Sequence, residues 1–294
     1  MTTWPELLAS DGPIVADGAM GTMLMANGLE FGDPPELWNL EHPEIIRRVQ
    51  RGYLAAGAQV LLSNTFGGNR LRLDLHGRAD RVDELNRTAA VLARVEVNAA
   101  DHPAIVAGDL GPTGQIMESI GGTLTPEIAR EVFAEQARAL AAGGADVMWV
   151  ETMSDVGEAV AAIQGARDAA PDLPVIATMS FDTRGHTMMG VTPERAAAAL
   201  LEAGAAAVGG NCGNGPEELV PVIERMRAAF PDAILVAKGN VGMPQLVGMS
   251  VQYETTPETM AGFARLFRDA GANVIGACCG STPPHLQAMA EALR

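Results

Sequence analysis

The chain has 294 residues, with 20 Lys and Arg against 36 Asp and Glu, so its formal net charge at pH 7 is −16. This acidic balance argues against a nucleic acid or an anionic membrane as partner, because both are bound through basic surfaces. The fractions of hydrophobic residues, 48%, and charged residues, 19%, are typical of a folded globular protein and exclude a disordered chain.

The first residues, Met1 to Glu6, have neither the basic start nor the apolar core of a signal peptide. No uncharged apolar run reaches the roughly 18 residues that a membrane span requires. We therefore expect a cytoplasmic protein that does not cross a membrane. Three cysteines, two of them adjacent, do not suit a disulfide framework.

Short apolar segments rich in Val and Ile alternate with longer segments rich in Ala, Leu, Arg and Glu. Continuous apolar strands are typical of a parallel sheet that is covered on both faces. The predicted strands are Ile14–Asp17, Val60–Ser63, Ile105–Asp109, Val147–Glu151, Val175–Met179, Ala207–Gly210, Leu235–Lys238 and Val274–Ala277. The helices predicted between them include Pro43–Ala56, Pro126–Ala142, Pro193–Ala203, Pro216–Phe230 and Pro257–Ala270.

Local signals mark where these helices begin and end. Thr-Pro pairs start several of them, because threonine can cap a helix and proline fits its first turn. Glycines in Ala-Gly-Ala or Gly-Gly-Ala segments follow them, which suits a left-handed residue after a helix. Eight strand–helix units predict a single (β/α)8 TIM barrel over residues 1–294, with a doubly wound open sheet as the competing fold.

In such a barrel, functional residues lie where strands end and the loops to the next helix begin. All three cysteines are at such positions. The polar and sulfur-containing residues at these ends are Asp17, Asn64, Thr65, Asp109, Glu151, Ser180, Asn211, Cys212, Asn240, Cys278 and Cys279.

Cys212, Cys278 and Cys279 predict one metal site and are the candidate catalytic residues. Three thiolates favour Zn²⁺ and leave its fourth position open, as in catalytic zinc sites. Adjacent strand residues point to opposite faces, so Cys278 and Cys279 share a metal only if the strand breaks there, which the flanking Gly276 and Gly280 would permit. Buried structural cysteines, a vicinal redox pair and an iron–sulfur cluster are the alternative interpretations.

A zinc ion with three thiolates is a poor Lewis acid for a carbonyl group, but it can hold a substrate thiol as a thiolate. A free thiol, with a pKa of about 8.5, is mostly protonated at neutral pH. The predicted chemistry is therefore nucleophilic attack by a bound substrate thiolate, for instance on a methyl group.

Six motifs resemble, in order and over essentially the whole chain, those of the homocysteine S-methyltransferase family. They are Asp17-Gly18-Ala19-Met20-Gly21-Thr22, Asn64-Thr65-Phe66-Gly67-Gly68-Asn69, Gly108-Asp109-Leu110-Gly111-Pro112-Thr113-Gly114, Glu151-Thr152, Gly209-Gly210-Asn211-Cys212 and Cys278-Cys279-Gly280-Ser281-Thr282-Pro283. The resemblance implies a homocysteine-binding (β/α)8 barrel whose zinc is held by the three cysteines.

The same resemblance assigns the homocysteine contacts. It implies that Asp17 and Glu151 bind the amino group, which suits two carboxylates beside a cation. The backbone near Gly18 and Ala19 and the side chains of Ser63 and Thr65 would bind the α-carboxylate. Asn240 resembles a residue that can supply an oxygen to zinc when substrate is absent, with a loop-capping role as the alternative.

The methyl donor is the open question. The segment from Gly32 to Pro43 is similar to bacterial enzymes identified as betaine–homocysteine methyltransferases, so glycine betaine is the expected donor. Trp38 would then face its trimethylammonium group, with Phe66 assisting. The animal betaine enzymes, however, have a tyrosine where this chain has Thr152. Alternative donors are a sulfonium such as S-methylmethionine and a methyl-corrinoid, which a separate protein would bring because no Asp-x-His-x-x-Gly signature occurs.

Two other functional classes remain open. One is a zinc–thiol protein that binds homocysteine without turnover. The other is a metal-free barrel enzyme such as an aldolase, for which Lys238, the only lysine of the chain, would form the Schiff base. The sequence does not determine the oligomeric state.

Overall fold

The computed structural model describes residues 2–243, 245–247, 250–253 and 255–294. Eight parallel strands form one sheet whose neighbours run in the order β1-β10-β7-β6-β5-β4-β3-β2. Their bounds are β1 (Ile14–Val15), β2 (Val60–Leu62), β3 (Ile105–Leu110), β4 (Val147–Met153), β5 (Val175–Met179), β6 (Ala207–Cys212), β7 (Leu235–Gly239) and β10 (Val274–Ala277).

The two ends of this sheet meet and close it into a barrel. Ala16 forms a parallel bridge to Val60. On either side of it, the Gln59 amide donates to the Val15 carbonyl at 2.7 Å and the Asp17 amide donates to the Val60 carbonyl at 3.0 Å. The (β/α)8 barrel is therefore confirmed, and the open sheet is excluded because β1 and β2 have no free edges there.

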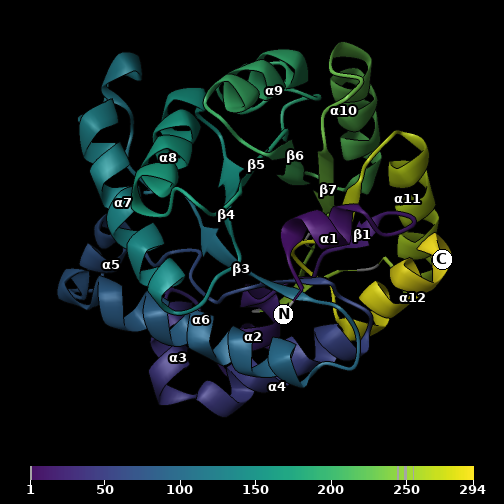
Figure 1. Ribbon diagram of the computed structural model, residues 1–294, viewed down its shortest axis with the longest axis horizontal. Coiled ribbons are helices and arrows are strands. Elements are labelled where there is room, and N and C mark those ends of the chain that lie inside the picture. Colours follow the sequence, from purple (N-terminus) through teal and green to yellow (C-terminus); the bar gives the residue numbers. More distant parts are fainter. Residues whose placement is uncertain (1, 244, 248–249, 254) are drawn as a thin grey trace.

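Helices surround the strands as an outer ring (Figure 1). Their bounds are α1 (Trp4–Leu8), α2 (Gly21–Met25), α3 (Trp38–Glu41), α4 (Pro43–Ala55), α5 (Arg70–Asp74), α6 (Val82–Ala99), α7 (Pro126–Ala142), α8 (Val156–Ala169), α9 (Pro193–Glu202), α10 (Pro216–Ala229), α11 (Pro257–Asp269) and α12 (Pro283–Leu293). Short 3₁₀ turns cover Pro35–Leu37, Ala79–Arg81 and Glu118–Ile120, and a small hairpin, β8 (Gln245–Val247) with β9 (Ser250–Gln252), lies between β7 and α11.

The predicted helix signals act as expected. The side chains of Thr125, Thr192 and Thr256 each accept the amide of the third residue of their helix. The glycines after α4, α7, α9 and α11 have φ between +96° and +102°, the left-handed region that glycine adopts at low cost.

β1 and β2 end earlier than predicted, β3 and β7 continue one residue further, and β4 and β6 continue two residues further. The extensions of β4 and β6 concern the site. β4 continues past Glu151 to Met153 through an irregularity in its pairing with β5. β6 continues past Gly210 to Cys212, which pairs with Gly239 of β7. Polar residues were expected to end these strands, but the backbone pairing continues through them.

The barrel interior is packed with apolar side chains and closed at one end. Trp4 and Leu7 of α1 pack against Ile14, Trp149 and their neighbours inside the barrel. α1 therefore covers the barrel interior at its amino end. A second, larger core lies between the sheet and the helices. Among the described residues, no helix combines the length and apolarity needed to cross a membrane.

Candidate active site

A cavity of about 430 Å³ opens at the carboxyl ends of the strands. Most of the residues predicted from strand ends line it. From the predicted site, these are Asp17, Gly18, Ala19, Ser63, Thr65, Glu151, Cys212, Cys278 and Cys279. Asp109, Thr152 and Lys238 also line it, whereas Trp38 and Asn240 do not.

The three cysteines form one cluster. Their Sγ atoms lie within 4.8 Å of one another, and those of Cys212 and Cys278 are 2.8 Å apart. Cys212 has φ +57°, which turns the chain at the end of β6. Cys278 and Cys279 follow Ala277, the last residue of β10, and Gly280 has φ +81°. The strand therefore breaks where two adjacent cysteines need it to break, as predicted.

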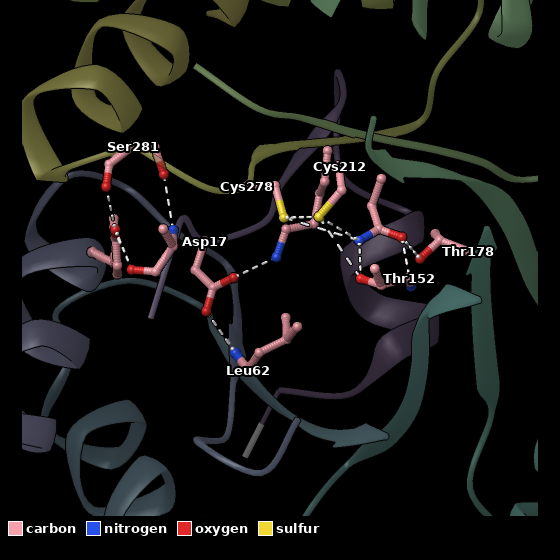
Figure 2. A network of polar contacts seen from close by, with 11 residues as sticks. Asp17, Leu62, Thr152, Thr178, Cys212, Cys278 and Ser281 are labelled. Carbon is pink, nitrogen blue, oxygen red and sulfur yellow. Dashed lines mark hydrogen bonds and ion pairs between the residues drawn. The ribbon is translucent and has the colours of Figure 1, made fainter. Parts of the chain in front are cut away.

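Asn211 connects this cluster to the neighbouring strand ends by hydrogen bonds to Thr152, Thr178 and Cys212, which Figure 2 labels. Its Oδ1 accepts the Thr152 amide at 2.8 Å and the Thr178 hydroxyl at 2.7 Å. Its Nδ2 donates to Thr152 Oγ1 at 2.7 Å and to Cys212 Sγ at 3.5 Å. The amide group of Asn211 is thus oriented to stabilise a thiolate at Cys212, and it fixes Thr152, whose φ is +60°.

The thiols share protons unequally. Hydrogen bonds from the thiols of Cys212 and Cys278 lower the pKa of Cys279 to about 4. Cys212 acts as a hydrogen-bond donor to the other two sulfurs, and this, with burial, raises its pKa. The cluster therefore accommodates one negative charge by itself, while a second and third thiolate need a nearby cation.

This donor set fits a zinc ion. Zn–S bonds of about 2.3 Å in a tetrahedral arrangement place ligand sulfurs about 3.8 Å apart, within the spread of this cluster. Binding would require the sulfurs of Cys212 and Cys278 to separate by about 1 Å relative to this structure. Three soft thiolates favour zinc over Mg²⁺ or Ca²⁺.

Asp17 forms a buried ion pair that the sequence did not predict. Lys238 Nζ lies 2.7 Å from Asp17 Oδ1, with both side chains at most 4% exposed. The Leu62 amide donates to Asp17 Oδ2 at 2.8 Å, as Figure 2 shows. The ammonium group also lies 5.3 Å from the centre of the Trp149 ring. Both oxygens of Asp17 are therefore held by the protein itself.

Lys238 is charged in this environment. Burial lowers its pKa, but the charges of Asp17 and Glu151 outweigh burial and hold the pKa above its usual range. A Schiff-base lysine must lose its proton to act as a nucleophile. The structure therefore argues against the aldolase interpretation.

Two further carboxylates face the cavity without partners. Asp109 Oδ1 and Glu151 Oε2 are buried and have no hydrogen-bond partner among the described residues. Burial, together with the charge of Cys278, raises the pKa of Glu151 to about 8. Burial and the charge of Glu151 raise the pKa of Asp109 well above its usual value. Unpaired buried carboxylates of this kind are common at binding sites.

The groups predicted to bind an α-carboxylate line the cavity, but their protons are already used. The Ala19 amide donates to Ser281 Oγ at 2.8 Å. The Thr65 hydroxyl donates to the Asp109 carbonyl at 2.8 Å, so the Ser63 hydroxyl, 2.7 Å from Thr65 Oγ1, donates to Thr65. A carboxylate would have to displace one of these bonds or use other backbone amides near Gly18.

Trp38 and Asn240 have positions other than those expected. Trp38 is 8% exposed and packs in the core, with its ring centre 4.5 Å from that of His42. Asn240 Oδ1 accepts the Cys279 amide at 3.0 Å and its Nδ2 donates to the Gly213 carbonyl at 2.7 Å. Trp38 therefore has the surroundings of a core residue, and Asn240 has the contacts of a loop-capping residue.

The sequence left Asp109 without a role and considered Lys238 only as a nucleophile. One signal was available. Three of the predicted strands end in a carboxylate and one ends in the only lysine, and strand ends of a barrel converge. A charge balance over the strand ends would have predicted an ion pair with excess acid around it.

Comparisons with known proteins agree with this geometry. A family model described as homocysteine S-methyltransferase matches residues 14–293. Methionine synthases of Mycobacterium leprae and Mycobacterium tuberculosis are each 31% identical over 299 residues, covering 95% of this chain. The chain spans 24% of the length of these curated relatives.

Among solved structures, the metallated form of the homocysteine methyltransferase MmuM from Escherichia coli superposes with a TM-score of 0.80. It is 24% identical, and the match covers 97% of this chain and 98% of that one. The oxidised form of the same protein gives a TM-score of 0.78. At this level of identity these matches establish the fold.

Proposed function

Because the chain belongs to the homocysteine S-methyltransferase family, we propose that it is a zinc-dependent enzyme that transfers a methyl group from a small onium donor to homocysteine, giving methionine. One observation carries the proposal. Three cysteine sulfurs lie within 4.8 Å of one another on the wall of a cavity that also presents unpaired carboxylates and a buried lysine. Homocysteine carries a thiol, which suits the cysteine cluster, and an ammonium group, which suits the unpaired carboxylates.

Cys212, Cys278 and Cys279 would hold the zinc ion. Bound there, zinc would keep the substrate thiol deprotonated at neutral pH. Asn211 orients the sulfur of Cys212, and Glu151 offers an unpaired carboxylate oxygen to the substrate ammonium group. The cavity walls fix the substrate against the donor, and such positioning can supply much of the rate of a bimolecular transfer.

Glycine betaine is the donor we propose. The same cavity is also lined by Glu36, Phe66 and Arg72. Glu36 is 3% exposed, so its carboxylate and the Phe66 ring can attract a quaternary ammonium group. Arg72 is in none of the ion pairs among the described residues, and its guanidinium can bind the carboxylate of the donor. These residues take the role that the sequence suggested for Trp38.

A sulfonium such as S-methylmethionine is the first alternative donor, because it also has a methylated cationic centre and a carboxylate, although it adds an ammonium group. The second is a methyl-corrinoid on a separate protein, which the resemblance to methionine synthases favours. One surface feature suits such a partner. The loops at the carboxyl end carry apolar side chains between 60% and 94% exposed, namely Phe31, Leu75, Ile116, Met188 and Met243. The domain extent 1–294 and a cytoplasmic location stay predictions.

The test is methionine formation by zinc-loaded protein from homocysteine with one donor at a time. Glycine betaine is expected to support many turnovers per chain. Arg72→Gln should then raise the KM for betaine roughly tenfold or more, as expected for a lost charged hydrogen bond, and leave the KM for homocysteine unchanged. Arg70→Gln is the control, because Arg70 pairs with Glu135 instead.

The outcomes separate the alternatives. Turnover only with S-methylmethionine or only with a methyl-corrinoid protein would refute betaine as the donor. The proposal that the cysteines hold zinc and the substrate thiol would stand. Homocysteine binding without methionine from any donor would favour the non-catalytic zinc–thiol protein.

A further inference from the structure

We infer that Asn211 is a positioning residue that lowers the reactivity of the Cys212 sulfur, so that the methyl group goes to the substrate thiol and not to a cysteine. The inference rests on the proposed function and deepens it. Cys212 lines the cavity that the methyl donor would enter. Thiolates are nucleophiles as well as metal ligands, so a protein with several of them at one cavity has to make its own sulfurs less reactive than that of the substrate.

The first argument is the orientation of the Asn211 amide group. A backbone N–H can only donate, so the Thr152 amide at 2.8 Å identifies the accepting atom as Oδ1. The Thr178 hydroxyl donates to the same oxygen at 2.7 Å. The NH₂ group therefore faces the cluster. One of its protons goes to Thr152 Oγ1 at 2.7 Å, and the other is left for Cys212 Sγ at 3.5 Å and Cys278 Sγ at 4.0 Å. These four partners are labelled in Figure 2.

The second argument is how firmly Asn211 is held. It is 1% exposed and pairs with Lys238 across β6 and β7. Its Oδ1 accepts the Thr152 amide where the pairing of β4 with β5 is irregular. Thr152 and Cys212 have φ of +60° and +57°, which is uncommon for residues other than glycine. Such strain is concentrated at functional sites. Because Asn211 bonds both strained residues, it fixes its own N–H against the Cys212 sulfur.

The third argument is what an N–H donor does to a thiolate. A thiolate has no proton to donate, so the hydrogen bonds between the thiols are lost once all three cysteines are ionised. In the described part of the chain, Asn211 then remains the only side chain whose N–H donates to these sulfurs. Such a bond stabilises the charge on sulfur, and the nucleophilicity of a thiolate falls as its basicity falls. The effect should be largest at Cys212, smaller at Cys278 and absent at Cys279.

The test is alkylation of the protein by a limiting amount of iodoacetamide, with zinc in excess over the Kd of the weakest variant. The cysteine sulfur gives an electron pair to the CH₂ carbon, the carbon–iodine bond breaks and iodide leaves. Trypsin then separates the peptide 196–225, which holds Cys212, from the peptide 269–294, which holds the other two cysteines. Mass spectrometry gives the rate for each peptide. Competition with a chelator gives the zinc affinity.

Two variants remove the N–H donor in different ways. Asn211→Asp keeps an oxygen for Thr152 and Thr178, whereas Asn211→Ala removes the whole amide and adds no charge. In both, alkylation of Cys212 should become roughly threefold to tenfold faster relative to the other peptide. The zinc affinity should fall roughly tenfold to a hundredfold, as for other residues that support metal ligands. Thr178→Val loses only the bond to Oδ1. It should act in the same direction more weakly, and it serves if the Asn211 variants do not fold.

Asn214→Asp is the matched control. Asn214 Nδ2 donates to the Asp182 carbonyl at 2.7 Å and to Glu218 at 3.1 Å, and to no sulfur, so the ratio of the two peptides should not change. A merely structural role of Asn211 would open the whole cluster and accelerate alkylation of all three cysteines equally. That result, or an unchanged rate at Cys212, would overturn the inference. The failure of the proposed function has another signature, which is no methionine from any donor while the Asn211 variants still change alkylation at Cys212.

Discussion

Replacing Lys238 by methionine removes the charge of the buried ion pair and keeps a side chain of similar length. At the observed 2.7 Å, two unit charges attract each other by about 6 kcal/mol if the effective dielectric constant is about 20. Losses of about 3–5 kcal/mol are typical when one partner of a buried pair is removed, because the other charge stays buried. We expect the free energy of unfolding to fall by about 3–5 kcal/mol.

The assay is urea and thermal unfolding of metal-free protein, followed by circular dichroism. A loss of this size corresponds to a fall in Tm of roughly 6–20 °C for a chain of this length class. Arg130→Met is the control, because Arg130 pairs with Asp168 on the surface and both side chains are 48% exposed. Such exposed pairs contribute less than about 1 kcal/mol.

A double-mutant cycle with Asp17→Asn tests the reasoning directly. If the pair acts as a unit, the double variant should be more stable than the sum of the two single losses predicts, by about 1 kcal/mol or more. Additive losses, or a Lys238→Met loss no larger than that of Arg130→Met, would refute the argument that burial makes this ion pair important.

Three further predictions concern the metal, the backbone and pH. Cys279→Ser should abolish the binding of about one zinc ion per chain, measured by metal analysis after dialysis, whereas Asn240→Ala should retain it if Asn240 only braces the loop. Gly209→Ala should yield little folded protein in an expression and circular dichroism assay, because the added Cβ would lie 1.9 Å from a β7 carbonyl oxygen. The control is Gly262→Ala in α11, where the space around the glycine is open. This change should be neutral or stabilise the fold by about 1 kcal/mol. Burial is the largest cause that raises the pKa of Glu151 from 4.5 to about 8, so the native state keeps a proton that the unfolded chain releases. Relative to Glu151→Gln, the natural protein should therefore lose stability as pH rises from 5 to 8, and an unchanged difference in urea midpoints would contradict this.

The sequence was sufficient for the barrel because each signal is local. Val175–Met179 and Val274–Ala277 were predicted with their observed bounds. A short apolar run between turn signals indicates a strand whichever strands lie beside it in the sheet. The cysteine cluster was also within reach, because strand ends converge in a barrel wherever the strands lie in the chain.

Contacts between segments that are distant in the chain could not be predicted from the sequence. Asp17 and Lys238 are 221 residues apart, and their pairing depends on how β1 and β7 are placed around the barrel. Tryptophan can bind a cation with its ring, but Trp38 is surrounded by core residues. Only the packing of α3 distinguishes a cation-binding role from a core role. A resemblance to a family transfers residue positions, but it does not reveal which oxygens of a transferred carboxylate are already bonded.

The charges of the cavity explain why one small molecule can satisfy both of its halves. Asp17 and Lys238 balance each other, while Asp109 and Glu151 remain in excess and the thiol cluster accepts a single negative charge by itself. Full ionisation of the carboxyl groups and the thiols therefore requires two cations, a metal at the sulfurs and an ammonium group at the carboxylates. Homocysteine would bring the ammonium group and, through its thiol, a fourth sulfur for the metal. A simple thiol or a simple amino acid meets only one of these needs, so we expect the affinity for homocysteine to exceed that for either fragment by more than the missing contact alone.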